Sequence, residues 1–250
     1  MQHLMGLVRR CVDDYQMIEA GDRIAVGVSG GKDSLALLAL MAGLQKYYPK
    51  PFELAAITID MGMGMDFGPV EAYCQSLGIP FTCFKTEIGP LIFDVRKEKN
   101  PCSMCAKMRR GALNDALKKL GFNKIALGHH YDDAVETFLL SLFYEGRLSC
   151  FQPVTYLSRM DVTQIRPMLY IGEKAVESFS KRQNLPVVEN RCPADKSTKR
   201  QEVKDLLADL QKQYPDLKTK IFGAMQRLPL PEWGPVTPPK GRQAIPDGTE

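Results

Sequence analysis

Hydrophobic residues fall into two kinds of pattern along the chain, short continuous runs and stretches with apolar positions three or four residues apart. The continuous runs predict strands at 23–28, 53–59, 81–85 and 124–127. The helical spacing predicts helices at 4–18, 34–47, 70–77, 102–120 and 132–144. Apolar strands that alternate with helices are typical of a parallel sheet covered on both faces. We therefore expect an α/β fold with a parallel sheet and helices on both faces.

The pattern is weaker beyond residue 150. It predicts a strand at 162–166 and helices at 173–183, 198–212 and 216–227. From residue 228 onward six prolines interrupt a polar stretch, a composition typical of disorder. We expect a single domain over 1–227, with a leading helix and a short helical C-terminal part, and a disordered tail at 228–250.

Composition narrows the class of protein. The 250 residues are 44% hydrophobic and 25% charged, as in ordinary globular proteins. No apolar run approaches the roughly 20 residues that a membrane span needs, and the N-terminus lacks the apolar core of a secretory signal. We therefore expect a cytoplasmic protein with no membrane partner. The net charge of +4 is too small to identify a nucleic-acid partner by itself.

The segment from Ser29 to Ser34, Ser-Gly-Gly-Lys-Asp-Ser, lies between a predicted strand and a predicted helix. Gly30 and Gly31 allow a tight bend and a close approach of phosphate oxygens to the backbone, and the helix start adds its positive dipole end. Lys32 supplies a mobile charge, and the serines at both ends supply hydroxyls. Asp33 is placed to cap the helix or to hold Mg²⁺. The segment therefore predicts a phosphate-binding loop.

This loop fits neither the Walker A pattern nor the Rossmann pattern. It resembles the PP-loop of the N-type ATP pyrophosphatases, which adenylate a carbonyl oxygen and release pyrophosphate. The resemblance implies ATP as a substrate and an adenine nucleotide alpha-hydrolase-like fold. Asp60 ends the second strand, at the edge of an open α/β sheet where ligands collect.

Seven cysteines are many for a reducing compartment, where grouped cysteines indicate metal or redox chemistry. Cys102 and Cys105 lie three apart at a predicted helix start, on one face, where the dipole lowers thiol pKa values. A third candidate, Cys192, lies in a predicted loop. The remaining four are expected to be inert buried thiols: Cys11, Cys74, Cys83 and Cys150.

The Cys-x-x-Cys pattern alone fits a redox pair, a metal site or chance. A structural zinc needs four closed ligands, and no second Cys-x-x-Cys is present. His129 and His130 are alternatives as zinc ligands, but they follow a strand, so we expect them to face a nucleotide. Three cysteines suit a [4Fe–4S] cluster with one iron left open, since four thiolates are the usual complement.

Three longer stretches carry a closer resemblance: Pro101 to Gly111, Leu127 to Asp133 with Glu136-Thr137, and Phe143-Tyr144 with Gly146. In this order, within about 1–210, they resemble the TtcA-type tRNA 2-thiocytidine synthetases. That family holds a [4Fe–4S] cluster with three cysteines, which map here onto Cys102, Cys105 and Cys192. The later family motif is commonly Cys-x-x-Cys, whereas Cys192 is followed here by Pro-Ala-Asp.

The resemblance implies that ATP adenylates a pyrimidine carbonyl oxygen of tRNA and that sulfur then replaces it, at C2 of a cytidine in the anticodon loop. It assigns Lys32 to the phosphates, Asp33 or Asp60 to Mg²⁺ or ribose, and Asp133 to orienting ATP or substrate. Gly128 and His129 are expected at the nucleotide. Arg109 is expected to stabilise the adenylated intermediate. The implied partners are tRNA and a sulfur donor, either a cysteine desulfurase or free sulfide, and a homodimer is left open.

Several of these residues also fit purely structural roles. Asp132 and Asp133 fit helix capping, and Arg109 and Arg110 fit solvated helix charges. Basic residues around the cysteines favour an RNA partner only if the cluster exists: Lys97, Lys99, Lys107, Arg109, Arg110, Arg191, Lys196, Lys199 and Arg200. Competing functions are a PP-loop enzyme that thiolates another tRNA base or a small molecule, and an inactive nucleotide- or cluster-binding regulator.

Overall fold

The computed structural model describes residues 1–96, 101–189, 191–192 and 199–227. Its six-stranded sheet has the order β3-β2-β1-β4-β6-β5. Five strands run parallel: β1 (Arg23–Gly27), β2 (Glu53–Asp60), β3 (Phe81–Lys85), β4 (Lys124–Ala126) and β6 (Val162–Ile165). The expected parallel sheet is thus confirmed, with one addition at its edge.

That addition is β5 (Val154–Leu157), which pairs antiparallel with β6. The sequence pattern missed it because the strand has four residues and no buried one, and Tyr156 is 60% exposed. An edge strand without a buried face gives little hydrophobic signal. β5 matters for function because it borders the cavity described below.

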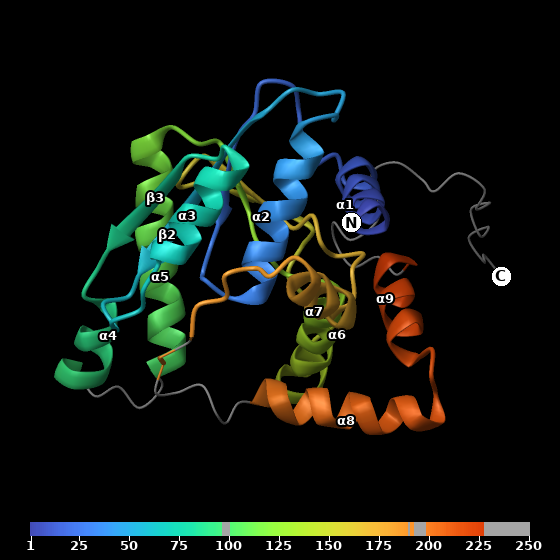
Figure 1. Ribbon diagram of the computed structural model, residues 1–250. Coiled ribbons are helices and arrows are strands. Elements are labelled where there is room, and N and C mark those ends of the chain that lie inside the picture. Colours follow the sequence, from blue (N-terminus) through green and yellow to red (C-terminus); the bar gives the residue numbers. More distant parts are fainter. Residues whose placement is uncertain (97–100, 190, 193–198, 228–250) are drawn as a thin grey trace.

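The first face of the sheet carries most of the helices. The large core cluster joins Ile24 and Val26 of β1 to α1 (Gln2–Asp14), α2 (Lys32–Gln45), α3 (Gly68–Leu77), α6 (Tyr131–Leu140) and α7 (Glu173–Arg182). Helix α2 is buried along most of its length and runs beside α7 (Figure 1). At the C-terminal end, α8 (Lys199–Gln213) and α9 (Leu217–Arg227) pack against α6.

The opposite face is covered chiefly by α5 (Pro101–Leu120), with α4 (Ile88–Pro90) and the π-helical turn η1 (Leu91–Arg96) beside it. Ala25, Ile57 and Ile125 point to this face and pack with Ala116 and Leu117 of α5. Since neighbouring residues of a strand point to opposite faces, Ala25 lies between Ile24 and Val26 of the other core. Helices on both faces are therefore confirmed.

Two expected boundaries were wrong. The leading helix ends at Asp14 rather than at residue 18, because Gln16 has φ +48° and turns the chain so that Met17 and Ile18 enter the core. The helix after β4 ends at Leu140 and continues as a π-helical turn, η2 (Ser141–Glu145). The turns α4 and η1 were not expected from the sequence.

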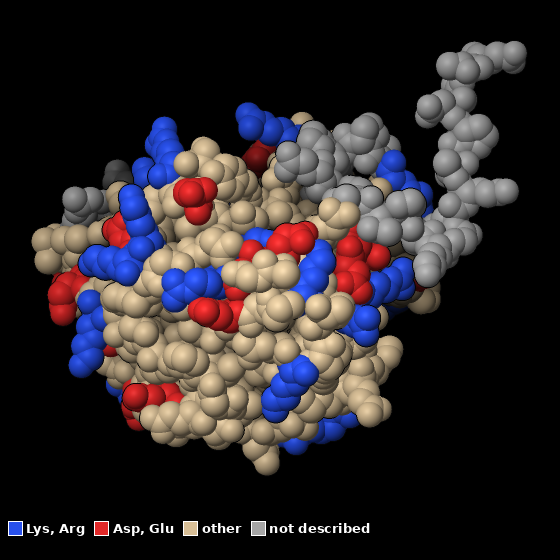
Figure 2. Space-filling view, turned by 90° about the horizontal axis from the view of Figure 1, so that it is seen from above, with Lys and Arg blue, Asp and Glu red and all other residues tan. Residues whose placement is uncertain are grey.

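The proposed tail at 228–250 lies outside the described residues, so the single-domain interpretation stays a prediction. Over the part of the chain that the structure describes, no helix is both long enough and apolar enough to span a membrane. Charges of both signs intermingle on the face at the top of Figure 1 (Figure 2). Among the exposed ion pairs, Arg23 lies 2.8 Å from Glu53 and Lys50 lies 2.9 Å from Glu19.

Candidate active site

The Ser29–Ser34 loop joins the carboxyl end of β1 to the first turn of α2. Its two serines hold each other, because the Oγ atoms lie 3.2 Å apart and Ser34 Oγ also accepts from the Ser29 N–H at 3.1 Å. Gly31 is the N-cap of α2 and has no side-chain cap. A loop with a bare N-cap leaves N–H groups at the helix start available to an anion.

Gly30 is required for the fold of this loop. Its φ is +86°, and a Cβ there would lie 2.9 Å from Val188 Cβ. The Val188 N–H donates to the Gly30 carbonyl at 2.9 Å, so the segment after α7 lies across the loop. Gly31 has an ordinary φ of −77°, and a Cβ there would meet only Ser29 Oγ, at 3.5 Å. The two glycines thus have separable roles.

Lys32 is held between two carboxylates. Its Nζ donates to Asp33 at 2.9 Å and to Glu173 of α7 at 3.4 Å, and Glu173 also pairs with Lys204 of α8 at 2.6 Å. Burial acts to lower the pKa of Lys32, but the two carboxylates outweigh burial and raise it. Lys32 is therefore a cation at neutral pH. Glu173 was not expected from the sequence, where it reads as an ordinary acidic residue in a first helical turn.

The turn after β4 packs against the PP-loop helix. A Cβ on Gly128 would lie 3.0 Å from the carbonyl carbon of Asp33 and 3.1 Å from Ser34 N, so only glycine allows this approach. His130 is the N-cap of α6, and it forms a capping box with Asp133. The Asp133 carboxylate accepts from the His130 N–H at 2.9 Å and lies 3.7 Å from Arg200. The capping alternative for Asp133 is therefore realised.

Asp132 and Asp60 have separate partners. Asp132 pairs with Lys218 of α9 at 2.7 Å and accepts from the Glu173 N–H at 2.6 Å. Burial acts to raise the pKa of Asp132, but these partners lower it. Asp60 ends β2 as expected, and its carboxylate accepts from the Gly62 N–H at 3.0 Å. A nucleotide role for Asp60 stays a prediction.

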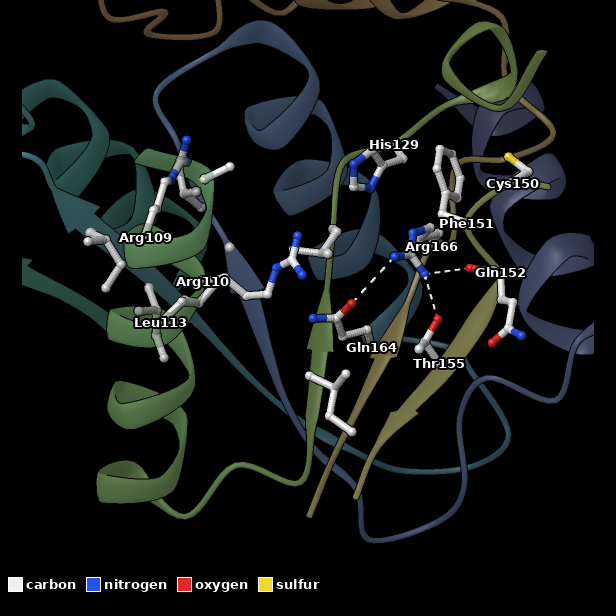
Figure 3. A pocket seen from close by; sticks show the side chains of 17 residues that line it. Arg109, Arg110, Leu113, His129, Cys150, Phe151, Gln152, Thr155, Gln164 and Arg166 are labelled. Atoms are coloured by element: carbon white, nitrogen blue, oxygen red, sulfur yellow. Dashed lines mark hydrogen bonds between the residues drawn. The ribbon is translucent and has the colours of Figure 1, made fainter. Parts of the chain in front are cut away.

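A cavity of about 680 Å³ opens beside the loop, between α5 and the β4-β6-β5 part of the sheet (Figure 3). Gly27 and Val28, the two residues before the loop, form part of its wall. Arg109 and Arg110 enter from α5, and in Figure 3 Arg110 reaches toward Gln164 while Arg109 points away from it. The expected role of Arg109 at the adenylated intermediate stays a prediction.

Arg166, which is only 6% exposed, is fixed on the opposite wall. Its guanidinium donates to the Gln152 carbonyl, to Thr155 Oγ1 at 3.2 Å and to Gln164 Oε1 at 3.4 Å. It lies 4.9 Å from the centre of the Phe151 ring. Burial lowers the pKa of Arg166 to about 10, which leaves it charged at neutral pH. Its Nε has no hydrogen-bond partner among the described residues.

His129 also lines this cavity, and its ring centre lies 4.8 Å from that of Phe151. Burial, reinforced by the charge of Arg166, lowers the pKa of His129 to about 4. The imidazole is therefore neutral at physiological pH. Its Nδ1 has no partner within the described part of the chain. The sequence placed His129 at the site but missed Phe151, Gln164 and Arg166, which stand in the weakly patterned region beyond residue 150.

The structure gives only indirect positions for two of the three candidate cluster ligands. Cys105 packs against the core cluster on the α5 face of the sheet, and Nη1 of Arg191, the neighbour of Cys192, would lie 3.4 Å from a Cβ on Gly64. The side chain of Cys102 is not among those described. No group of three His, Cys, Asp or Glu side chains suited to a metal ion is found among the side chains that the structure does describe. The trio therefore stays a prediction.

The other four cysteines have inert surroundings. Burial raises the pKa of Cys74 to about 11 and that of Cys150 to about 12, and it also raises the pKa values of Cys11 and Cys83. These thiols are protonated at neutral pH, and a metal ligand must be a thiolate. Cys150 differs from the other three in that it also lines the cavity.

The basic residues expected near the cysteines differ in their exposure and in their intramolecular partners. Lys199 lies over the Tyr144 ring at 4.3 Å, and Arg200 pairs with Glu136 at 3.2 Å, so both have intramolecular partners. Lys107 and Arg191 are exposed. Lys97, Lys99 and Lys196 lie outside the described residues.

Comparison with known proteins decides the family. The PP-loop domain family matches residues 7–210. Two tRNA-cytidine(32) 2-sulfurtransferases match over nearly the whole chain. The protein of Pelobacter propionicus is 39% identical over 232 residues (91% of this chain, 85% of the relative), and that of Geobacter sulfurreducens is 38% identical over 226 residues (89% and 88%).

The chain belongs to the tRNA-cytidine(32) 2-sulfurtransferase family of PP-loop proteins. A solved structure, the U34-tRNA thiolase NcsA of Methanococcus maripaludis with its [4Fe–4S] cluster, is 26% identical to this PP-loop protein with a TM-score of 0.70. The match covers 86% of this chain and 75% of that one. The expected family and the adenine nucleotide alpha-hydrolase-like fold are thereby confirmed.

Proposed function

We propose that this protein is an ATP-dependent tRNA sulfurtransferase that replaces the O2 atom of a cytidine, at position 32 of the anticodon loop, with sulfur. The observation that carries the proposal is the PP-loop beside a cationic cavity, in a chain 39% identical to a tRNA-cytidine(32) 2-sulfurtransferase. The reaction has two steps. The cytosine O2 attacks the α-phosphorus of ATP and releases pyrophosphate, and sulfide then attacks C2 and expels AMP together with the former O2.

The PP-loop serves the first step. The N–H groups at the start of α2 and the ammonium of Lys32 would hold the β- and γ-phosphates, whose charge grows as pyrophosphate leaves. Lys32 must exchange Glu173 for phosphate to do this, because its Nζ donates to the Glu173 carboxylate at 3.4 Å. Asp33 is the better candidate for Mg²⁺, since it lies beside Lys32, whereas Asp60 accepts from Gly62.

Arg109 and the residues after β4 would act on the adenylated base. Arg109 enters the cavity from α5, where its charge can offset the negative charge on the α-phosphate. Asp133 would act indirectly, by capping α6 and so fixing the turn that contains Gly128 and His129. These roles rest on position in the fold.

The donor set fits an iron–sulfur cluster. Cys105 and Cys192 are both half-buried, whereas burial raises the pKa values of the four remaining cysteines and so disfavours the thiolate that a cluster needs. Cys102, Cys105 and Cys192 would be the ligands. When bound, a [4Fe–4S] cluster with three protein ligands supplies an open iron at which sulfide can be held. The partners are then tRNA and a sulfur donor.

The test is an anaerobic reaction of the reconstituted protein with ATP, Mg²⁺, sulfide and unmodified tRNA. We expect 2-thiocytidine and pyrophosphate in equal amounts, and Cys102→Ala, Cys105→Ala and Cys192→Ala should each abolish the visible absorption of the cluster and the thiolated product. Cys83→Ala is the matched control and should keep both. Zinc-loaded protein with full activity would contradict the sulfur chemistry, and 2-thiouridine as the product would contradict the cytidine assignment.

A further inference from the structure

The cavity between α5 and the β4-β6-β5 part of the sheet contains features that ATP does not explain. Besides Arg109, which is assigned above to the adenylate, the guanidinium groups of Arg110 and Arg166 line it, and the described residues of its wall include no Asp or Glu. We propose that this cavity binds the target pyrimidine nucleotide of the RNA, turned out of the loop, with Arg110 on its phosphate and the Arg166–Gln164 pair on its base. The inference rests on the proposed function, for which it names the substrate subsite.

Charge favours RNA over adenosine as the occupant. The β- and γ-phosphates of ATP have their own site at the PP-loop, and Arg109 is assigned to the α-phosphate. Because adenine is uncharged, ATP does not account for the charges of Arg110 and Arg166. A nucleotide of an RNA chain brings phosphates on both sides of its base. Because no carboxylate is found among the described residues of the wall, these residues leave the charges of Arg110 and Arg166 without a neutralising partner there. A cavity of about 680 Å³ is also within the range typical of small-ligand sites and holds one nucleotide.

The position of the cavity suits the chemistry. Gly27 and Val28 form part of its wall, and the next residue begins the PP-loop. A base that enters the cavity therefore lies next to the phosphate site, where its carbonyl can reach the α-phosphorus. Bases of RNA loops are commonly read in this way, unstacked and packed against aromatic rings and arginine planes.

Two residues of the wall each have a buried polar atom that lacks a hydrogen-bond partner in the part of the chain that the structure describes. Arg166 Nε and His129 Nδ1 both lack a hydrogen-bond partner among the described residues, and leaving such atoms unsatisfied costs about 1–3 kcal/mol each. Phe151 lies against both side chains and fixes their orientation. Both residues line the cavity, so a small shift of either side chain would bring its unsatisfied atom to a base bound there.

Gln164 gives this wall a preference among bases. Arginine has only donors, so Gln164 must direct its oxygen to Arg166, and its NH₂ group faces the cavity toward Arg110 (Figure 3). The Gln164 NH₂ and the Arg166 Nε–H thus form a wall of donors. Cytosine presents adjacent acceptors at O2 and N3, whereas uracil presents a donor at N3. The wall therefore favours cytosine over uracil.

The test compares steady-state kinetics for tRNA and for ATP in two variants. Arg110 is exposed and is not needed for folding, so Arg110→Gln should lower kcat/KM for tRNA at least about tenfold and leave KM for ATP within about twofold. Lys118→Gln, an exposed cation of the same helix that does not line the cavity, should leave kcat/KM for tRNA and KM for ATP within about twofold of the wild-type values. Gln164→Glu keeps an oxygen for Arg166 but removes the donor, and it should lower thiolation of tRNA at least about tenfold.

Two results would overturn the inference. If Arg110→Gln and Gln164→Glu raise KM for ATP and spare the kinetics for tRNA, the cavity binds adenosine. If both variants behave like wild type, the cavity binds neither substrate. These failures differ from a failure of the proposed function, in which the wild-type protein itself would not thiolate tRNA.

Discussion

The PP-loop and the arginine cavity are neighbouring cationic regions whose charges are held in different ways. Lys32 is paired with the carboxylates of Asp33 and Glu173, whereas Arg166 is held by the neutral oxygens of Gln152, Thr155 and Gln164. A cation paired with carboxylates contributes little net charge until a phosphate replaces them. A cation held by neutral acceptors keeps its charge. The first arrangement suits a nucleotide that arrives with Mg²⁺, and the second suits a polyanion.

The largest effect should come from removing the charge at the PP-loop. Lys32→Ala should lower kcat for tRNA-dependent pyrophosphate release by roughly 10²–10³-fold, because the ammonium stabilises charge that develops as the phosphate bond breaks. Lys204→Ala removes the other cation that pairs with Glu173, and it should leave this kcat within about threefold of the wild-type value. Equal losses in both variants would mean that Lys32 acts only through the ion-pair network.

The two loop glycines separate folding from nucleotide binding. Gly30→Ala should lower the free energy of unfolding by about 2–3 kcal/mol, because the positive φ and the contact with Val188 exclude a Cβ. Gly31→Ala should lower the free energy of unfolding by less than about 1 kcal/mol. It should nevertheless raise KM for ATP, because the new methyl group occupies space at the N-cap of α2. Urea unfolding and ATP kinetics measure the two effects. Equal losses of stability would contradict the assignment.

The neutral His129 on the cavity wall makes stability depend on pH. Its pKa is about 4 in the fold against an ordinary value of 6.5, so below pH 6.5 the unfolded chain takes up a proton that the fold excludes. Stability should therefore fall between pH 6.5 and 4. We expect the free energy of unfolding, measured with urea, to fall between pH 7.5 and 5.0 by about 1–2 kcal/mol more in the wild type than in His129→Gln. Identical losses in the two proteins would show that His129 is not buried as a neutral group.

The smallest effect should come from Glu173. Glu173→Gln removes a carboxylate that Lys32 must leave when phosphate binds, so KM for ATP should fall about twofold to fivefold while kcat changes little. Glu177→Gln, one turn further along α7, is the control and should match the wild type. A higher KM in Glu173→Gln would indicate that Glu173 positions Lys32 instead of competing for it.

Local signals in the sequence were sufficient for the PP-loop and for most of the sheet, whereas the expected role of His129 at the nucleotide stays a prediction. They were sufficient because Ser29–Ser34 and the buried strands are continuous in sequence. The cavity wall could not be predicted, because Arg166, Gln164 and Phe151 are brought together by the edge pair of β5 and β6. Glu173 was missed for the same reason, since its contact with Lys32 spans 141 residues and depends on α7 packing beside α2.

The most direct test of the central claim is mass spectrometry of tRNA nucleosides from a strain that lacks this gene, complemented either with the wild type or with Lys32→Ala. We predict that 2-thiocytidine is absent from the deletion strain, returns with the wild-type gene and stays absent with Lys32→Ala. Unchanged 2-thiocytidine in the deletion strain, or full recovery with Lys32→Ala, would contradict ATP-dependent thiolation of cytidine by this PP-loop.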